Sequence, residues 1–452
     1  MGRLFGTNGV RGVANRELTV EMVTRLAASI GAYFGGSVAV GRDGRTTSPM
    51  FRDAAVCGLL SVGCNVYDAG MLPTPALQHA VRSNGLSAGI MITASHNPPE
   101  FNGLKVIASD GVEASRGQES EIEEIYFGDG PELSPWNGIG AIHRLEALEA
   151  YKEAILSHVD VERIRGAGLK VAVDPGNGVA ALSAPGIAQA LAGKVFTVNV
   201  DVDGSFPNRV SEPKPDNLGG LQALVRASGA DLGVAYDGDG DRSIFVDERG
   251  DVHWGDRSFA LLAREFIVKN PGARVASPVN SSRALEEVVS GAGGSVVWTQ
   301  VGSVVVSRRM VDEGIPFGGE ENGGIMYGPH LQVRDGSMAL ALIMEVMAET
   351  GKPLSQLFGE LPQYSQVKDR VSCPEELKEA VLEALRGRVD APRVETIDGV
   401  KLIYDDESWV LFRPSGTEPI FRIYAEAGSP ERVKALVKEH KSLIESVVES
   451  LR

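Results

Sequence analysis

Three stretches of the chain repeat one order of short apolar runs, and this repeat limits the fold more than any other feature. In each stretch, three such runs alternate with segments of helical length. The runs lie at 37–40, 64–67 and 88–92, then at 169–173, 194–198 and 232–236, and then at 273–276, 295–298 and 315–317. Short continuous apolar runs are typical of strands buried on both faces, and strands that alternate with helices form α/β layers. We therefore expect three similar α/β domains.

The remainder of the chain, from about Tyr364, has a different pattern and predicts a smaller α+β domain. It contains apolar runs at 410–412 and 420–424 and a final helix. Ser429 is the expected N-cap of that helix and Pro430 its first residue. A chain of 452 residues also exceeds what one hydrophobic core usually serves. The domains that we expect span residues 1–150, 151–252, 253–363 and 364–452.

The last strand of each repeat runs directly into a loop of unusual composition. These loops are TASHNPP at 93–99, DGDGDR at 237–242 and GEENGG at 319–324. In open α/β sheets, ligands bind beyond the carboxyl ends of the strands. We therefore expect the three loops to meet at one central cleft.

The loop DGDGDR predicts a metal site. Asp237, Asp239 and Asp241 alternate with glycines, so three carboxylates can turn toward one point without steric cost. Their oxygens suit the hard cations Mg²⁺ and Ca²⁺. A calcium loop of the EF-hand type is the alternative, because Glu248 falls at its last position, but Arg242 stands where that loop needs glycine. We expect Mg²⁺, with Arg242 beside it as a partner for phosphate.

The loop TASHNPP places Ser95 just after an apolar strand. A serine hydroxyl is a poor nucleophile unless a neighbour takes its proton, and the GxSxG motif of serine hydrolases is missing here. Two interpretations stay open from these residues. Ser95 is a nucleophile, or the loop is a turn in which Asn97 and Pro98 reverse the chain.

The loop RPSGTEP at 413–419 has the composition of an anion site. Arg413 can bind a phosphate through two parallel hydrogen bonds, while Ser415, Thr417 and the amides near Gly416 add donors. A surface turn is the alternative, because its proline and glycine also suit a turn.

The loop GEENGG offers groups that suit a sugar. Glu320 and Asn322 could hold hydroxyls, and glycines such as Gly323 permit close approach. A turn capped by polar residues explains the same composition.

Together and in this order, the segment FGTNGVRG at 5–12 and the four loops resemble the α-D-phosphohexomutase superfamily. Its members, which include phosphoglucomutases, phosphomannomutases and phosphoglucosamine mutases, move a phosphate between O6 and O1 of a hexose phosphate. The resemblance extends over nearly the whole chain. It implies an α/β fold of three similar domains with mixed sheets and a smaller C-terminal α+β domain around a central active-site cleft.

The resemblance also implies a role for each loop. Ser95 matches a phosphoserine whose phosphate completes the coordination of one Mg²⁺ ion per chain, held by Asp237, Asp239 and Asp241. The phosphoserine donates to a hexose phosphate or hexosamine phosphate, and a hexose 1,6-bisphosphate is the intermediate and the activator. The residues matched to substrate binding are Glu320, Asn322, Gly323, Arg413, Ser415, Gly416, Thr417 and Arg422. Those matched around the transferred group are Arg11, Lys105, Arg242 and His96.

The chain departs from the family where a proton carrier is often found. Many members read GE-x-SGH, whereas this chain has Asn322 for the serine and Gly324 for the histidine. His96 follows Ser95, but consecutive side chains diverge in an extended loop, so we expect His96 only to orient phosphate. Lys105 lies in an apolar run that predicts a strand returning along the loop.

Lys105 therefore has two interpretations. Partial burial beside other cations would disfavour its charged form and make it an acid–base group near neutral pH. Alternatively, it is a permanently charged ligand of phosphate.

The opening FGT-x-GxRG and the ending SGTEP are more similar to phosphoglucosamine mutases of the archaeal type than to phosphomannomutases. This resemblance implies glucosamine 6-phosphate as substrate. The alternative is a phosphomannomutase/phosphoglucomutase of broad specificity. A sugar phosphatase and a sugar-phosphate sensor share most of the motifs and complete the alternatives.

Charge and cysteine content limit partners and compartment. A net charge of −16 disfavours nucleic acid and anionic membranes as partners. No apolar run approaches the ~18 residues that cross a bilayer. Three cysteines without a CxxC pair fit a reducing cytoplasm. The sequence leaves a homodimer open.

Overall fold

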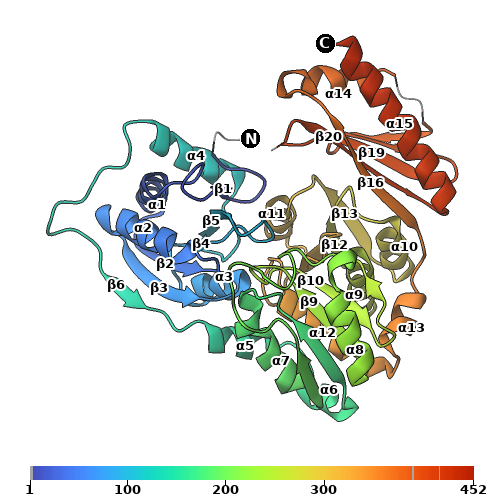
Figure 1. Cartoon of the computed structure of the whole chain (residues 1–452), viewed down its shortest axis with the longest axis horizontal. Helices are drawn as coiled ribbons and strands as arrows, with labels where there is room; N and C mark the ends of the chain where they lie inside the picture. Colours follow the sequence, from blue (N-terminus) through green and yellow to red (C-terminus); the bar gives the residue numbers. More distant parts are fainter. Residues whose placement is uncertain (1–3, 389–390, 417) are drawn as a thin grey trace.

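The computed structural model describes residues 4–388, 391–416 and 418–452. In these ranges the strands form four sheets, which follow one another along the chain (Figure 1). The first three sheets are mixed and carry helices between their strands, whereas the fourth is antiparallel. The expected fold class is therefore confirmed.

The first sheet has six strands, in the order β1-β5-β4-β2-β3-β6. Its strands are β1 (Val10–Val13), β2 (Ser37–Arg42), β3 (Asn65–Met71), β4 (Ala88–Ile92), β5 (Phe101–Ala108) and β6 (Ile142–Arg144). The helices among them are α1 (Val20–Phe34), α2 (Ser48–Ser61), α3 (Thr74–Ser83) and α4 (Arg116–Phe127). β4 is buried along its whole length, as its apolar sequence predicts. β5 returns antiparallel to β4 and places Lys105 opposite Met91.

The second sheet has five strands, in the order β11-β10-β9-β7-β8. Its strands are β7 (Lys170–Asp174), β8 (Lys194–Thr197), β9 (Leu232–Tyr236), β10 (Ser243–Asp247) and β11 (Val252–His253). The helices before and among them are α5 (Leu148–Leu156), α6 (Val161–Ala167), α7 (Ala184–Leu191) and α8 (Gly219–Ser228), with 3₁₀ turns at Val179–Leu182 and Pro215–Asn217. β9 and β10 are both buried throughout.

The third sheet has four strands, in the order β13-β12-β14-β15. Its strands are β12 (Arg274–Pro278), β13 (Ser295–Thr299), β14 (Phe317–Gly319) and β15 (Ile325–Tyr327). The helices are α9 (Gly255–Lys269), α10 (Arg283–Gly291), α11 (Ser303–Glu313), α12 (Gly336–Thr350) and α13 (Leu354–Gly359). β14 begins two residues later than the apolar run 315–317 predicts, because Pro316 has no N–H to donate to a neighbouring strand.

The fourth sheet has five strands, in the order β16-β20-β19-β18-β17. Its strands are β16 (Ser365–Ser372), β17 (Arg393–Glu395), β18 (Val400–Ile403), β19 (Trp409–Pro414) and β20 (Ile420–Ala427). A 3₁₀ turn at Glu375–Leu377, α14 (Lys378–Arg386) and α15 (Pro430–Ser450) complete the unit. The side chain of Ser429 caps α15, as predicted. Figure 1 shows this unit, in red and orange, apart from the blue first unit.

The three signature loops share one structural setting. Each connects a strand to an antiparallel neighbour, β4 to β5, β9 to β10 and β14 to β15. The strand that leads into each loop also pairs in parallel with the first predicted strand of its repeat, which is β2, β7 or β12. The repeat seen in the sequence is therefore a repeat in space, with the polar loop at the same end of each sheet.

Helix α12 is a central element of the core that the second and third units share. Its residues are buried along most of their length, and it packs against α5, α6, α7 and α9. Asp335 caps the helix by accepting hydrogen bonds from the amides of Ser337 and Met338. The cap fixes the direction of the preceding residue, Arg334. Among the residues that the structure describes, no helix is long and apolar enough to cross a membrane.

Candidate active site

Ser95 adopts an unusual backbone conformation at the end of β4. Its φ is +50°, in the left-handed region that non-glycine residues rarely occupy, and its side chain is buried. The hydroxyl donates to Oδ2 of Asp237 at 2.8 Å and lies 3.2 Å from Nδ1 of His96. The expectation that Ser95 and His96 diverge in an extended loop is therefore wrong. The left-handed turn at Ser95 brings the two side chains together.

The three aspartates of the DGDGDR loop form one buried cluster. One carboxylate oxygen from each of Asp237, Asp239 and Asp241 lies within 4.8 Å of the others. Oδ1 of Asp239 and Oδ1 of Asp241 are buried and have no hydrogen-bond partner among the described residues. Buried oxygens without partners are costly, and a hard cation would satisfy them. The donor set therefore fits Mg²⁺.

A glycine allows the metal loop to approach the serine loop. A Cβ at Gly238 would lie 2.5 Å from the carbonyl oxygen of Ser95, which is closer than real contacts allow. Thr74, at the start of α3, also joins the two units, because its hydroxyl donates to Oδ2 of Asp239 at 2.6 Å. The predicted meeting of the first two loops is thus built from direct contacts.

The EF-hand alternative does not fit this geometry. Glu248 follows the five residues of β10, so the strand separates it from the aspartates by roughly 15 Å or more. Its carboxylate instead accepts hydrogen bonds from Ser355. The described residues therefore do not form a calcium loop of that type.

Two buried cations neutralise the aspartate cluster. Nζ of Lys105 lies 2.6 Å from Oδ2 of Asp239 and 2.9 Å from Oδ2 of Asp241. Nη2 of Arg334 lies 2.5 Å from Oδ2 of Asp241, and its Nη1 lies 3.2 Å from Oε2 of Glu320. Arg334 thereby joins the metal loop to the sugar loop. Arg334 was not among the predicted site residues, and no motif in the sequence singles it out.

The pKa of Lys105 moves in the direction that the second interpretation, a permanently charged ligand, requires. Burial lowers it, but the attraction of Asp239 and Asp241 is stronger, so the pKa is raised above its ordinary value. This direction favours the permanently charged ligand over the acid–base group. The cause is the pair of carboxylates, whose contact with Lys105 could not be read from the sequence.

The aspartates themselves shift in different directions. Burial, and then the charges of Asp241 and Asp239, raise the pKa of Asp237 to about 8. Burial would also raise the pKa of Asp239, but Lys105 outweighs it and the pKa is lowered. At Asp241, Arg334, Lys105 and Arg242 together outweigh the effect of burial and lower the pKa. The site therefore holds two firmly ionised carboxylates and a third whose charge depends on its surroundings.

Arg11 and Arg242 both lie near the Ser95 loop. Nη1 of Arg11 donates to the carbonyl of Ala94 at 3.2 Å and to Oδ1 of Asn97 at 2.8 Å. Burial lowers the pKa of Arg11 to about 10. The amide of Arg242 donates to Asp237, and its Nη1 lies 3.4 Å from Glu212.

The surroundings of His96 favour its neutral form. Its pKa is lowered well below the ordinary value, first by burial and then by the charges of Arg242 and Arg11. A neutral imidazole can accept a hydrogen bond from Ser95 or donate one to an anion, depending on its tautomer.

The sugar loop lies beside the aspartates. Glu320 is buried, and burial raises its pKa although Arg334 opposes the shift. Asn322 is half-buried and accepts a hydrogen bond from the amide of Gly324 at 3.2 Å. A Cβ at Gly324 would lie 2.4 Å from Cδ of Arg334. The backbone of Gly323 packs against the carbonyl of Ser243, in the second unit.

The fourth loop is held within its own unit. Nε of Arg413 lies 2.9 Å from Asp398, and Arg422 lies opposite it on β20 and pairs with Glu418 at 2.6 Å. Lys378, at the start of α14, donates to the carbonyls of Ser415 and Glu418 and so fixes the turn. Ser415 is buried and Gly416 is exposed. Thr417 lies outside the described residues.

The chain matches four family models along its length. They are described as phosphoglucomutase/phosphomannomutase, alpha/beta/alpha domains I, II and III, at residues 2–131, 149–250 and 254–364, and the C-terminal domain of the same proteins at 370–441. The predicted boundaries near residues 150, 252 and 363 stay predictions.

Similar proteins cover the chain from end to end. A phosphoglucosamine/phosphogalactosamine mutase from Sulfurisphaera tokodaii is 44% identical over 98% of this chain and 100% of its own length. A phosphoglucomutase/phosphomannomutase from Thermococcus kodakarensis is 39% identical over 99% of this chain and 100% of its own. A solved phosphoglucomutase/phosphomannomutase family protein from Burkholderia thailandensis has a TM-score of 0.87 at 28% identity, covering 98% of this chain and 97% of that one.

Proposed function

Because the chain belongs to the phosphoglucomutase/phosphomannomutase family, a family of phosphosugar mutases, we propose that it interconverts glucosamine 6-phosphate and glucosamine 1-phosphate. The enzyme class follows from the family and from the relatives that match the whole chain. The amino sugar is supported by the name of the relative that is 44% identical, as against 39% for the phosphoglucomutase/phosphomannomutase.

One observation carries the mechanism that we propose. The Ser95 hydroxyl lies 2.8 Å from one of three buried, clustered aspartates, with Lys105 and Arg334 against the other two. Phosphoryl transfer asks a protein mainly to position the reacting oxygens and to neutralise charge on the phosphoryl group. A nucleophilic oxygen surrounded by cations and by metal ligands meets both needs.

The proposed cycle begins with a phosphate on Ser95. The bond between phosphorus and Oγ of Ser95 breaks as phosphorus bonds to O1 or O6 of the sugar phosphate. The sugar hydroxyl gives up its proton in this step, and Oγ of Ser95 takes up a proton as it leaves. The product is a hexosamine 1,6-bisphosphate. Its other phosphate then returns to Ser95 by the reverse chemistry, so no phosphate is lost. A trace of hexose bisphosphate activates the enzyme by loading Ser95.

The cation that we propose for this site is one Mg²⁺ ion per chain. Asp237, Asp239 and Asp241 would hold it together with the group on Ser95, and their two unpartnered oxygens support this assignment. When bound, it would supply positive charge beside the transferred phosphoryl group. Lys105 and Arg242 would add charge from the protein.

Binding of the sugar is assigned to two further loops. Glu320 would accept hydrogen bonds from the hydroxyls and the amine of the sugar. Asn322 could both accept such bonds and donate them. Arg413, with Ser415 and Arg422, would bind the phosphate that does not react. Such an anchor makes the two orientations of the sugar nearly equivalent and contributes remote binding energy.

A substrate comparison tests the proposal. We expect kcat/KM to be highest for glucosamine 6-phosphate in a panel that also contains galactosamine, mannose and glucose 6-phosphates, each with a trace of glucose 1,6-bisphosphate. Higher kcat/KM for mannose or glucose phosphate would replace the amino-sugar assignment with the broad-specificity alternative. A phosphatase would release inorganic phosphate in proportion to turnover. We expect no such release in these reactions. Ser95→Ala is the inactive control.

A further inference from the structure

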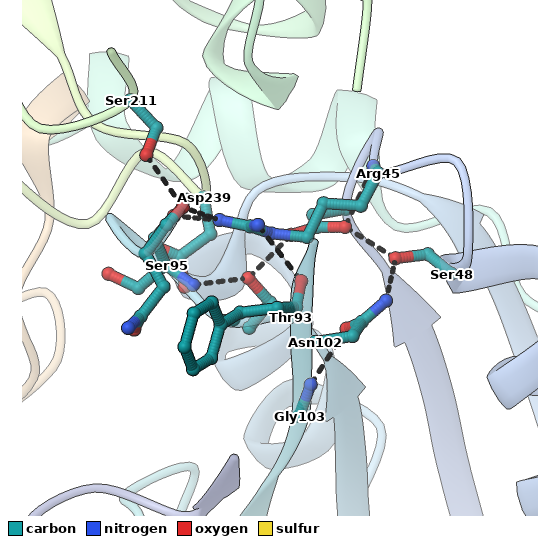
Figure 2. Close-up of polar contacts among 12 residues, drawn as sticks. Arg45, Ser48, Thr93, Ser95, Asn102, Gly103, Ser211 and Asp239 are labelled. Carbon is teal, nitrogen blue, oxygen red and sulfur yellow. Dashed lines mark hydrogen bonds and ion pairs between the residues drawn. The ribbon is translucent and has the colours of Figure 1, made fainter. Parts of the chain in front are cut away.

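The guanidinium of Arg45 is buried beneath the Ser95 loop and bonds to its backbone (Figure 2). Nη2 donates to the carbonyls of Ser95 and Asn97 at 2.8 and 2.6 Å. Nη1 donates to the carbonyls of Pro98 and Phe101 at 2.5 and 3.0 Å. One side chain from the loop between β2 and α2 therefore holds four carbonyls of the Ser95 loop. None of these contacts is to a side chain that reacts in the proposed cycle.

Asp43 extends this network to the other side of Ser95. Its Oδ2 accepts from Nε of Arg45 at 3.0 Å and from the Thr93 hydroxyl at 2.7 Å. Oγ1 of Thr93 in turn accepts from the amide of Ser95 at 2.9 Å. The N–H of Ser95 is thus fixed through Thr93, and its C=O is fixed directly by Arg45. With both flanking peptide groups held, the φ of +50° at Ser95 is held as well.

This conformation decides where the Ser95 hydroxyl points. A left-handed non-glycine residue relaxes toward negative φ unless the surrounding structure prevents it. Rotation about φ would carry Oγ of Ser95 away from Asp237, to which it now donates. Residues held in such conformations by their surroundings are often found at active sites.

We propose that Arg45 is a positioning residue for phosphoryl transfer, which holds Ser95 in the left-handed conformation that aims its Oγ at the metal ligands. This role rests on the proposed function of Ser95 as the phosphoryl carrier. The hydrogen bonds of the Arg45 side chain go to Asp43 and to backbone carbonyls of the loop, and none goes to Asp237, Asp239 or Asp241. A lysine cannot replace it, because a single ammonium lacks the planar fork that reaches four carbonyls and Asp43 together.

The second unit covers this network. The ring of Phe206 lies 5.1 Å from the guanidinium carbon of Arg45. Ser211 donates to the carbonyl of Asn97 at 3.1 Å, the same oxygen that Arg45 contacts. A Cβ at Gly204 would lie 2.4 Å from Cα of Arg45. The conformation of Ser95 therefore depends on the segment 204–211 as well as on its own unit.

The first experiment measures phosphate transfer to Ser95 in one turnover. Dephosphorylated Arg45→Lys is mixed with glucose 1,6-bisphosphate and Mg²⁺, and the phosphorylated fraction is followed by intact mass. We expect transfer to be ~10²-fold slower than in wild type, since misplacing a reacting atom by about 1 Å has that effect. KM for the sugar phosphate and the Kd for Mg²⁺ should stay within about threefold. Arg52→Lys is the matched control and should transfer at the wild-type rate, because Arg52 lies in α2 and forms a partly exposed ion pair with Asp68 of β3.

Wild-type transfer rates in Arg45→Lys would overturn the proposal. An equal loss of Mg²⁺ binding, substrate binding and thermal stability would also overturn it, because that pattern indicates a general structural role. If Arg45→Lys does not fold, Thr93→Val tests the same network. This variant removes the hydroxyl that connects Asp43 to the Ser95 amide and keeps the side-chain volume. We expect Thr93→Val to slow transfer and Thr93→Ser to keep it, and equal rates in the two would contradict the proposal.

A readout without catalysis separates this proposal from the proposed function. Hydrogen exchange of the amides at residues 95–97, 100 and 101 in the dephosphorylated protein should quicken in Arg45→Lys, while exchange in β2 and β4 stays as in wild type. Unchanged exchange in the loop would exclude Arg45 as its clamp. If instead wild type turns over sugar phosphate with no phosphate on Ser95, the proposed function fails, and the exchange result shows whether Arg45 still fixes the loop.

Discussion

The side chain of Arg334 lies against Gly324, with its Cδ 2.4 Å from the point that a Cβ on Gly324 would occupy. From this place the guanidinium pairs with Asp241 of the metal loop and with Glu320 of the sugar loop. Many members of the family carry a histidine where this chain has Gly324. Here Arg334, which directly precedes the N-cap of α12, fills the space beside the sugar loop. It places a positive charge there, but an arginine does not serve as a proton carrier.

Gly324→His should therefore lower activity rather than restore a missing group. The new side chain would displace Arg334 from both carboxylates, and we expect kcat to fall by about tenfold or more. Because the two residues share one space, adding Arg334→Ala to Gly324→His should cost much less than it costs alone. Steady-state kinetics of the single and double variants measure this coupling. Gly166→His, in α6 with open space around it, is the control, and higher activity in Gly324→His would contradict the interpretation.

Asp239→Asn should weaken both Mg²⁺ binding and turnover. It removes one charge from the cluster and so weakens the hydrogen bonds that Lys105 and Thr74 donate to this side chain. Loss of one preorganised electrostatic element typically lowers the rate by ~10²-fold. Titration calorimetry with Mg²⁺ and steady-state rates test this together, with exposed Asp216→Asn as the control. Near-normal turnover of the variant in the presence of a chelator would contradict the assignment of the metal site. Higher activity with Ca²⁺ than with Mg²⁺ would support the calcium alternative.

Lys105→Arg and Lys105→Met separate the two interpretations of Lys105. The raised pKa of Lys105 indicates a permanent charge, since Asp239 and Asp241 outweigh burial. Arginine keeps that charge but cannot give up its proton. We therefore expect turnover to fall by less than about tenfold in Lys105→Arg and by ~10²-fold or more in Lys105→Met. If turnover falls equally in the two variants while their affinity for sugar phosphate is unchanged, the proton transfer would be assigned to Lys105.

Arg413→Ala should weaken binding of sugar phosphates. The charge-assisted hydrogen bonds assigned to this side chain are worth roughly 1.5–3 kcal/mol, so KM should rise by about ten- to a hundredfold. The 1,6-bisphosphate should also escape before it reorients, and it would be detected in solution by mass spectrometry. Arg393→Ala, an exposed arginine in β17 of the same unit, is the control. Unchanged KM and no released bisphosphate would exclude Arg413 from the substrate site.

Three histidines at the junction of the first three units predict a pH dependence of stability. The ring of His330 stacks on His79 at 5.5 Å and meets His158 edge-on at 5.3 Å. Burial, and then His330, lower the pKa values of His79 and His158. Asp335 opposes this shift at His79, and Arg82 adds to it.

The sign follows from proton uptake. Because the folded pKa values lie below the unfolded value of ~6.5, the unfolded chain binds more protons as the pH falls. The stabilisation is therefore full above pH ~6.5 and is lost as the pH falls through the lower, folded values. We expect the melting temperature to fall less between pH 7.5 and 5.5 in a His79→Gln, His158→Gln variant than in wild type. A variant of exposed His143 is the control, and identical slopes in the double variant and wild type would refute the prediction.

The sequence determined the elements and the loops that matter. Buried strands such as β4 and β9 follow from their continuous apolar residues, and the cap of α15 follows from Ser429 and Pro430. Asp237, Asp239 and Asp241 could be grouped because alternation with glycine turns neighbours in the chain toward one point. These features depend on residues within a few positions of one another, so local patterns contain them.

Only the tertiary structure decided how the site is held. Arg334 reaches Asp241 across 93 residues, and Lys105 reaches Asp239 across 134, so no local pattern reveals either pair. For the same reason the direction of the Lys105 pKa could not be read from its apolar run. The left-handed turn at Ser95 likewise depends on Arg45, which lies 50 residues away. Propensity and spacing act along the chain, whereas charge neutralisation and backbone strain are settled by whatever the fold brings into contact.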